Sequence, residues 1–272
     1  MPVKLSYYLS EAIGTFVMMF LGISAIAFNF ATEFMTEVLP SERMRLLLTG
    51  IMFAGGATLV IYSPVGRISG AHLNPAVSLA FFLQKKIGIK DTAVFMVVQC
   101  LGSMTAAFLV LFLWGNHAKQ IKMGMTLPGT GQNILFVFLV EIFITFLLII
   151  SLFFFLHRKS LTRYTGLALG ILVASLVFLT ANISGTSLNP ARSLGPAIAA
   201  VNFSFLWIYL TAPFVGSILA VLTAAYISSF ARPLCAKLNH QEEPCLYEAC
   251  EFRNGSAAPH LHAIRPDRIG PL

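Results

Sequence analysis

Hydrophobic residues in this chain form long runs that short polar segments interrupt. Charged residues are absent from positions 46–66, 92–118, 164–191 and 193–231. A run of about 18 or more apolar residues is long enough to cross a bilayer as a helix. The pattern therefore predicts six membrane spans, at roughly 6–30, 46–65, 92–115, 134–156, 164–183 and 205–229.

Two apolar segments outside these spans begin with nearly the same phrase. Residues 69–79 read SGAHLNPAVSL and residues 184–194 read SGTSLNPARSL, identical at eight of eleven positions and 115 residues apart. Proline suits the first position of a helix, where its missing N–H costs nothing, and asparagine is a favoured N-cap. The phrase predicts two helices, over 75–84 and 190–200.

Each of these helices is half as long as a membrane span. About ten residues at 1.5 Å each cover ~15 Å of a hydrocarbon core that is ~30 Å thick. Two such half-helices that meet end to end form a seventh, composite span. The loops that precede them are tolerated at membrane depth only if they line a cavity.

An internal repeat orders the whole chain. The string EAIGTF begins at Glu11 and EIFITF begins at Glu141, while Gly-Ser at 102–103 recurs at 216–217. The matches follow the same order, which predicts repeats at about 1–115 and 134–230 within one channel domain, 1–230. Three spans per repeat is an odd number, so the second repeat is inverted. The expected fold is all-α, with six transmembrane helices and two re-entrant half-helices.

The duplicated phrase also predicts a chemistry for the membrane midplane. Both half-helices direct a positive N-terminus, roughly half a charge each, toward the centre. The capping amides add N–H donors. Such an arrangement repels cations and orients a neutral hydrogen-bonding molecule. The predicted midplane residues are Asn74, Pro75, Ala76, Asn189, Pro190 and Ala191.

Two acids, Glu11 and Glu141, lie within the predicted spans at matching repeat positions. A carboxylate at that depth costs at least ~2.5 kcal/mol on insertion scales. We expect both to face the interior and brace the re-entrant loops through backbone N–H groups, with His72 in a similar role. The alternatives are a proton relay for the glutamates and pH gating for His72.

Arg192 stands where the first copy of the phrase has Val77. It follows Asn189 by three residues, about one helical turn. An arginine at membrane depth usually marks a pathway. We expect it to donate hydrogen bonds and to repel cations at the outer constriction; a snorkelling surface arginine is the alternative.

Composition supports the membrane assignment and orients the chain. Apolar residues make up 57% of the sequence and charged residues 11%, against about 25% charged in soluble domains. The net charge of +7 therefore indicates orientation, not nucleic-acid binding. Eight lysines and arginines in short segments on one side, against five on the other, predict that both termini are cytoplasmic. A cleaved signal peptide is not expected, because Glu11 interrupts the first apolar run and the repeat requires this segment.

The tail, 231–272, has mixed charges and several prolines, and is predicted to be cytoplasmic and largely disordered. Its cysteines and histidines offer metal ligands, but their spacing matches no standard zinc pattern. We therefore expect a solvated tail with no metal and no cofactor. The residues concerned are Cys235, His240, Cys245, Cys250, His260 and His262.

At the repeated phrases the sequence resembles the major intrinsic protein family, the aquaporins and aquaglyceroporins. The likeness covers about 5–230, through HLNPAVS, SLNPARSLGPA, both glutamates and the six-span repeat. The resemblance implies a homotetramer in the bilayer with one pore per subunit. Each pore would pass water or small neutral solutes passively, without an enzymatic activity.

The resemblance also implies a selectivity filter of Ala54, Val177, Thr186 and Arg192, carried over by spacing from Asn74 and Asn189. Strict water channels are similar to one another in having Phe and His at the first two positions, where this chain has small residues. The set is closer to nodulin-like intrinsic proteins and their bacterial relatives, which carry water, glycerol, urea and neutral metalloid acids such as boric and arsenous acid.

Two other functions stay open at this point. One is a strict water channel in which a neighbouring ring, Phe53 or Phe178, fills the gap at the filter. The other is a proton-coupled secondary transporter that uses Glu11 or Glu141.

Overall fold

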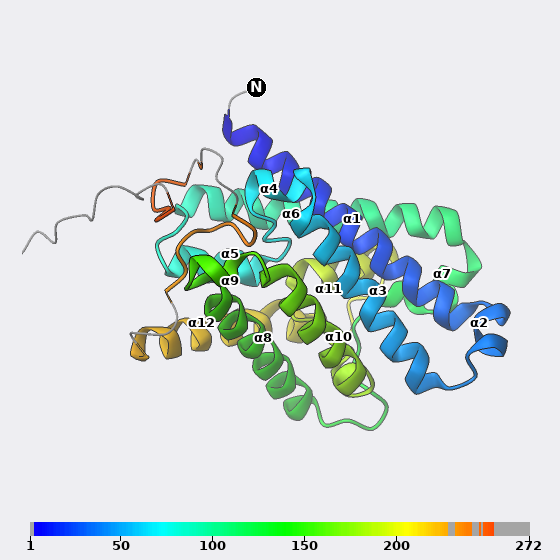
Figure 1. The fold of residues 1–272 in the computed structure, drawn as a ribbon. Coiled ribbons are helices and arrows are strands. Elements are labelled where there is room, and N and C mark those ends of the chain that lie inside the picture. The colour runs from blue at the N-terminus through cyan, green and yellow to red at the C-terminus, as the bar shows by residue number, and fades with distance from the viewer. Residues whose placement is uncertain (1–2, 228–231, 241–244, 246, 253–272) are drawn as a thin grey trace, which may run out of the picture.

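The computed structural model describes residues 3–227, 232–240, 245 and 247–252, and within these ranges the secondary structure is entirely helical (Figure 1). Among the described residues, six helices are long and apolar enough to cross a membrane. Their bounds match the predicted spans to within a few residues, so all six predictions are confirmed. The helices are α1 (Val3–Ala31), α3 (Glu42–Tyr62), α6 (Ile89–Trp114), α8 (Ile134–Leu156), α10 (Thr165–Ser184) and α12 (Leu206–Tyr226).

The two half-helices are α5 (Pro75–Leu83) and α11 (Pro190–Ala199). Each begins at proline, as predicted, and each is capped by the preceding asparagine. The side-chain oxygen of Asn74 accepts a hydrogen bond from the backbone N–H of Ala76 at 2.8 Å. The side-chain oxygen of Asn189 accepts one from Ala191 at 3.0 Å.

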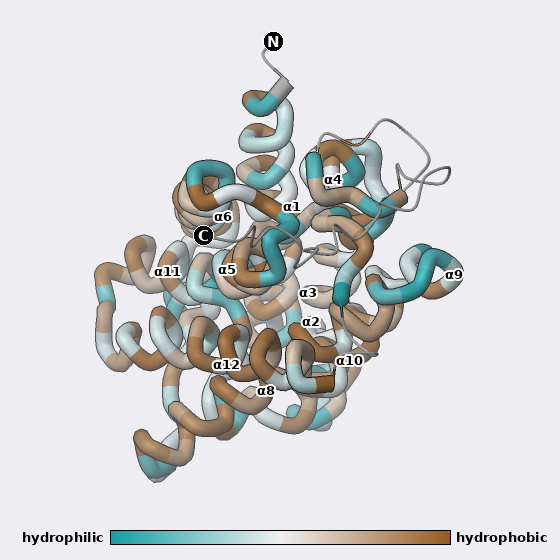
Figure 2. Tube along the Cα trace, turned by 90° about the vertical axis from the view of Figure 1, so that its left-hand side faces the viewer, coloured by the Kyte–Doolittle hydropathy of each residue, from teal (hydrophilic) through white to brown (hydrophobic). Residues whose placement is uncertain are grey.

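Short helices connect the long ones. Because each spans at most six residues, none of them crosses a membrane; α9 is largely hydrophilic in Figure 2, in contrast to α8 and α12. They are α2 (Glu33–Val38), α4 (Pro64–Ser69), α7 (Asn116–Gln120), the 3-10 turn η1 (Lys122–Gly124) and α9 (Lys159–Thr162).

The two repeats use the same glycine contact between their outer helices. A Cβ atom at Gly102 of α6 would lie 2.3 Å from the carbonyl oxygen of Ala12 in α1. A Cβ atom at Gly216 of α12 would lie 2.4 Å from the carbonyl oxygen of Ile142 in α8. Real Cβ atoms cannot approach so closely, so glycine at both positions permits equivalent helix crossings.

Each half-helix packs on a long helix of the other repeat. Gly195 of α11 lies against Ser103 of α6. In the symmetric contact, the Ser217 hydroxyl of α12 donates a hydrogen bond to the carbonyl of Ala76 in α5 at 2.8 Å. The Gly-Ser pairs at 102–103 and 216–217 therefore join the repeats into one bundle.

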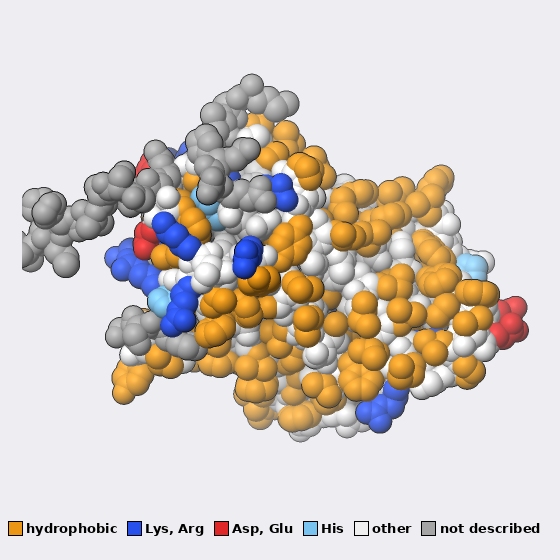
Figure 3. Space-filling view, in the orientation of Figure 1, with side chains coloured by type: hydrophobic (Ala, Val, Ile, Leu, Met, Phe, Trp, Pro, Cys, Tyr) orange, Lys and Arg blue, Asp and Glu red, His pale blue; other side chains and the backbone are white. Residues whose placement is uncertain are grey.

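Apolar side chains spread across the middle of one face of the bundle (Figure 3). Figure 3 shows apolar side chains covering the middle of the molecule, with lysines and arginines gathered mainly at the end where α4 and α9 lie. Exposed apolar residues on the long helices include Leu59, at 68% exposure, and Phe112, at 83%. Soluble monomers rarely expose contiguous apolar patches of this size to water. This is therefore an integral membrane protein.

The predicted disorder of the tail is wrong for its described part. Leu234 donates its backbone N–H to the carbonyl of Leu156, and Leu238 donates to the carbonyl of Gly70, both at 3.0 Å. Ala236 and Leu238 are buried. The tail segment is therefore packed on the end of the bundle because its apolar residues find partners there. The two histidines at 260 and 262 lie outside the described residues.

Candidate pore

A cavity of about 290 Å³ lies between the long helices and the two re-entrant loops. Asn74 and Asn189 line it together, although 115 residues separate them. The four filter candidates line the same cavity: Ala54, Val177, Thr186 and Arg192. The structure thus gathers around one space the residues that sequence spacing had grouped.

The two asparagine amides cross between the loops. Asn74 Nδ2 donates to the carbonyl of Leu188 at 2.9 Å, and Asn189 Nδ2 donates to the carbonyl of Leu73 at 2.8 Å. A carboxamide carries two N–H donors, so one donor of each side chain is left for the cavity. The other predicted midplane residues are buried in the first turns of their half-helices and do not contribute to the described lining: Pro75, Ala76, Pro190 and Ala191.

The loops that carry these asparagines have the same unusual backbone. Ala71 and Leu73 have φ of 57° and 54°, and their counterparts Thr186 and Leu188 have φ of 50° and 56°. Residues other than glycine rarely adopt positive φ. Each such residue costs roughly 1–3 kcal/mol unless its surroundings hold it, so both loops need support from elsewhere.

Glu11 supplies that support to the first loop. Its carboxylate accepts hydrogen bonds from the backbone N–H groups of His72 and Leu73, at 2.9 and 2.8 Å. The Ser69 hydroxyl and the Gln99 amide also donate to it, at 2.6 and 2.8 Å. The side chain is fully buried, so every bond is made away from water.

Glu141 makes the equivalent contacts in the second loop. It accepts hydrogen bonds from the backbone N–H groups of Ser187 and Leu188, at 2.9 and 3.1 Å, and from the Ser184 hydroxyl at 2.7 Å. Hydrogen bonds to a charged group contribute about 1.5–3 kcal/mol each, which is enough to offset the backbone strain. Neither glutamate is among the described residues that line the cavity.

His72 lies in the cavity wall and links the first loop to two other segments. Nδ1 lies 3.0 Å from the Ser78 hydroxyl in α5, and Nε2 lies 2.8 Å from the carbonyl of Ala236 in the tail. The ring stacks on Phe81, with ring centres 4.6 Å apart. The sequence did not anticipate the bond to the tail.

Arg192 is buried, with 7% of its surface exposed. Nη1 donates to the carbonyl of Gly124 at 2.8 Å, and the guanidinium carbon lies 5.4 Å from the centre of the Phe53 ring. Because the side chain is held inside the protein and lines the cavity, it does not snorkel to the membrane surface.

A family model described as major intrinsic protein matches residues 3–224. The chain belongs to the major intrinsic protein family. It is therefore a passive membrane channel and not an enzyme. The tail, 231–272, lies beyond the match.

Members of the family in plants, bacteria and archaea are similar to this chain. The probable aquaporin NIP7-1 of Arabidopsis thaliana is 33% identical over 83% of this chain and 78% of its own length. A glycerol uptake facilitator protein-like 6 of Lactiplantibacillus plantarum is 33% identical over 82% and 98%. The aquaporin AqpM of Methanothermobacter marburgensis is 31% identical over 81% and 96%.

The fold is also similar to that of a solved family member. The aquaglyceroporin from Plasmodium falciparum superimposes with a TM-score of 0.66 at 26% identity. The match covers 83% of this chain and 97% of that one.

Two features of the pore wall in this family member have no clear signal in the sequence. The Gly124 carbonyl, which holds Arg192, comes from an irregular turn with no periodicity to reveal its position. Leu238 of the tail also lines the cavity, and nothing in the local sequence indicates it.

Phe53 lines the cavity, whereas Phe178 is not among its described lining residues and instead lies under Arg43.

Proposed function

We propose that this channel passes water and small uncharged solutes, including glycerol, urea and boric or arsenous acid, and excludes ions and protons. The observation that carries the proposal is the joint lining of one cavity by Asn74, Asn189 and the filter candidates. Amide and guanidinium donors on one side of such a cavity suit hydroxyl and carbonyl oxygens. The solute keeps hydrogen-bond partners while it sheds water.

Exclusion of cations follows from the charges around the cavity. The N-termini of α5 and α11 meet there, and each contributes roughly half a positive charge. Arg192 adds a full charge, and no aspartate or glutamate is among the described lining residues. The apolar parts of the wall cannot replace the hydration shell of an ion. An ion would therefore lose hydration without compensation.

Admission of solutes wider than water follows from the small filter side chains. Ala54 and Val177 stand where the resemblance places large rings in strict water channels. An aromatic side chain buries about 150–250 Å², so the substitution opens space. Thr186 contributes a polar hydroxyl group to the filter. This hydroxyl lies 2.7 Å from the hydroxyl of Thr180. The names of the relatives, aquaporin and glycerol uptake facilitator, support this class of solute.

A strict water channel is the second candidate, and one observation favours it. Phe53 lines the cavity and its ring lies beside the Arg192 guanidinium. A ring in this place narrows the space that Ala54 leaves. The permeability of the wild type to glycerol distinguishes the two candidates.

A proton-coupled transporter has less support. It requires Glu11 or Glu141 to exchange protons with the permeation path. Both carboxylates are fully buried, bonded to loop N–H groups and absent from the described cavity lining. Their geometry favours the bracing role that we propose for them, together with His72.

We further propose that the protein is a homotetramer in a plasma or inner cell membrane, with both termini in the cytoplasm. The exposed apolar surface leaves ample area for contacts with lipid and with other subunits. Chemical cross-linking in membranes, with four copies as the largest product, tests the assembly.

A double substitution tests the filter. Ala54→Phe with Val177→His adds two rings at the cavity wall, and we expect glycerol and urea flux to fall to background while water flux persists. The measurement is stopped-flow light scattering on proteoliposomes, with boric and arsenous acid as further solutes.

Leu59→Phe is the matched control, because it adds a ring on the same helix, α3, at an outward-facing position that is 68% exposed and does not line the cavity. Its fluxes should equal those of the wild type. A wild type that passes water but excludes all four solutes would contradict the wide-filter proposal and favour a strict water channel.

A further inference from the structure

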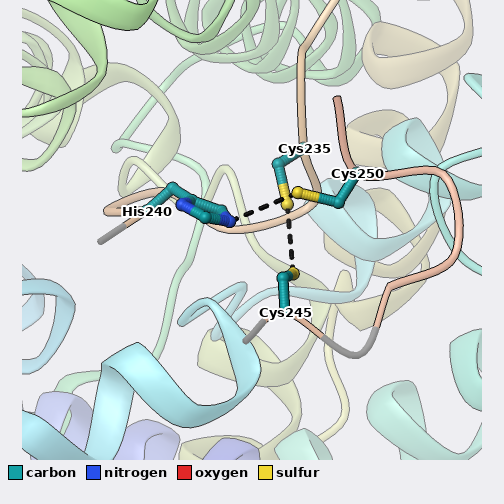
Figure 4. A group of neighbouring side chains, drawn as sticks. All are labelled: Cys235, His240, Cys245 and Cys250. Atoms are coloured by element: carbon teal, nitrogen blue, oxygen red, sulfur yellow. Dashed lines mark hydrogen bonds between the residues drawn. The ribbon is translucent and has the colours of Figure 1, made fainter. Parts of the chain in front are cut away.

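Four side chains of the tail that could bind a metal lie close together (Figure 4). One donor atom from each of Cys235, His240, Cys245 and Cys250 lies within 4.8 Å of every other. The residues are spaced by five positions each, which matches no standard zinc motif. Sequence spacing alone argued against a metal here, and the folded tail reverses that expectation.

The distances between the donor atoms are close to those around a tetrahedral metal. The sulfurs of Cys235 and Cys245 are 3.6 Å apart, and the Cys250 sulfur lies 3.2 Å from Nε2 of His240. Zinc, with Zn–S bonds of about 2.3 Å and Zn–N bonds of about 2.0–2.1 Å, separates neighbouring ligand atoms by about 3.5–3.8 Å. Small side-chain movements would bring all four atoms to one ion.

The chemistry of the donors selects the metal. The three cysteines are buried and free of disulfides. Three sulfurs and one imidazole form a closed, soft ligand set that is typical of structural zinc sites.

Two of these residues, Cys235 and His240, flank the part of the tail that reaches the cavity. Residues 236–239, which we call the plug segment, lie between Cys235 and His240, and all four are buried. The Ala236 carbonyl is bonded to His72, and the Leu238 backbone is bonded to Gly70. Leu238 lines the same cavity as His72 and Leu73.

Further contacts fasten the rest of the tail to the same end of the bundle. The Tyr247 hydroxyl donates to the carbonyl of Ser69, and its ring lies 5.2 Å from that of Tyr7. Lys86 donates to the Ala249 carbonyl and forms an ion pair with Glu251 at 2.7 Å. These residues have no helix or strand of their own in the described ranges, so a metal would supply the cross-link that secondary structure does not.

We propose that Cys235, His240, Cys245 and Cys250 bind one zinc ion, and that the ion holds the plug segment over the pore mouth formed by the first re-entrant loop. Zinc loss frees the ends of the plug segment, and Leu238 then leaves the cavity. The site lies beyond the part of the chain that matches the family model. The gating half of this inference rests on the proposed channel function, whereas the metal site does not.

Metal content of the purified full-length protein tests the site. Protein prepared with reductant and zinc should retain one ion per chain by elemental mass spectrometry. Cobalt in its place should give the strong visible absorption of tetrahedral thiolate complexes. Cys250→Ser should lose most of the metal, while Cys100→Ser, which removes a thiol from α6, should keep it.

Zinc content near zero in the wild type, or unchanged in Cys250→Ser, would overturn the site. A disulfide among the tail cysteines in protein purified without oxidant, detected by mass spectrometry under non-reducing conditions, would also overturn it. Neither readout depends on solute flux.

Permeability tests the gate. In proteoliposomes, a membrane-permeant zinc chelator should raise water and glycerol flux several-fold for the wild type and for Cys100→Ser. Cys250→Ser should start at the high level and ignore the chelator. Leu238→Ser should keep its zinc and still show high flux, because the metal remains while the apolar plug is lost.

Zinc removal without a change in flux would contradict the proposed gating role but not the proposed zinc site. Absence of solute flux in every variant, with or without zinc, would contradict the proposed channel function, while the metal measurements would still stand.

Discussion

At the scale of single residues, the two buried glutamates show why strain and charge occur together. Glu11 and Glu141 lie beneath loops in which four non-glycine residues adopt positive φ. A buried carboxylate is costly alone, and a strained loop is costly alone. Several charged hydrogen bonds join the carboxylate to the loop, so the carboxylate and the loop stabilise each other. The same pairing occurs once in each repeat.

Glu141→Gln should destabilise the protein before it changes selectivity. The amide keeps the volume but turns an N–H toward the N–H groups of Ser187 and Leu188, and each lost charged bond removes about 1.5–3 kcal/mol. Thermal unfolding of purified protein, followed by size-exclusion chromatography, measures the loss. Glu37→Gln is the control, since Glu37 is exposed. Normal stability with altered pH dependence of flux would instead indicate a titrating role.

Asn189→Asp should weaken the exclusion of cations. The substitution introduces a negative charge where two positive helix ends meet, and it removes the N–H donor that bonds the Leu73 carbonyl. Proton leak into proteoliposomes, measured with an internal pH dye, should rise. Asn133→Asp is the control, because Asn133 also caps a helix but does so at the exposed start of α8. Unchanged water flux and unchanged leak in Asn189→Asp would contradict the proposed midplane role.

At the scale of elements, glycines determine how closely the half-helices approach the long helices. A Cβ atom at Gly195 would lie 2.2 Å from the Ser103 hydroxyl and 2.7 Å from the Ser103 carbonyl. The backbone atom cannot rotate away. The contact therefore fixes the depth of α11 against α6, and with it the positions of Asn189 and Arg192.

Gly195→Ala should therefore lower stability and flux together. Overpacking of a tight contact costs about 1–3 kcal/mol, and we expect a corresponding fall in the thermal unfolding midpoint. Gly55→Ala is the matched control, because a Cβ atom there meets nothing within 4 Å and alanine favours helix. Equal stability of the two variants would show that α6 moves to accommodate the added methyl group, and would contradict the prediction.

At the scale of the whole molecule, six spans place both termini on one side of the membrane. The end that holds α4, α9 and the described tail also gathers most of the visible lysines and arginines (Figure 3). The positive-inside bias predicts that this end faces the cytoplasm.

Reporter fusions in a bacterial host check this orientation. Green fluorescent protein at the C-terminus should fluoresce, because it matures in the cytoplasm. Alkaline phosphatase joined after Gly131, in an exposed turn between α7 and α8, should be active only outside. The reverse pattern of signals would show that the charge bias misled the assignment.

The sequence by itself determined the spans, the half-helices and the repeat. Each depends on local information: the length of an apolar run, a proline at the first helical position, or a phrase written twice. In a bilayer this local information is enough to predict helices, because a segment whose backbone N–H and C=O groups lack hydrogen bonds cannot cross the hydrocarbon core. The filter candidates followed from fixed spacing within the resemblance.

Only the tertiary structure decided which distant groups meet. The crossed amide bonds, the Gly124 carbonyl at Arg192 and the Phe53 ring beside the filter join segments with no shared local pattern. The tail is the clearest case. Its composition is typical of disorder, yet residues 236–239 are buried, Leu238 lines the cavity, and four cysteine and histidine side chains at an unfamiliar spacing have donor atoms within 4.8 Å of one another. Composition averages over a segment, whereas packing depends on the few residues that find a surface complementary to them.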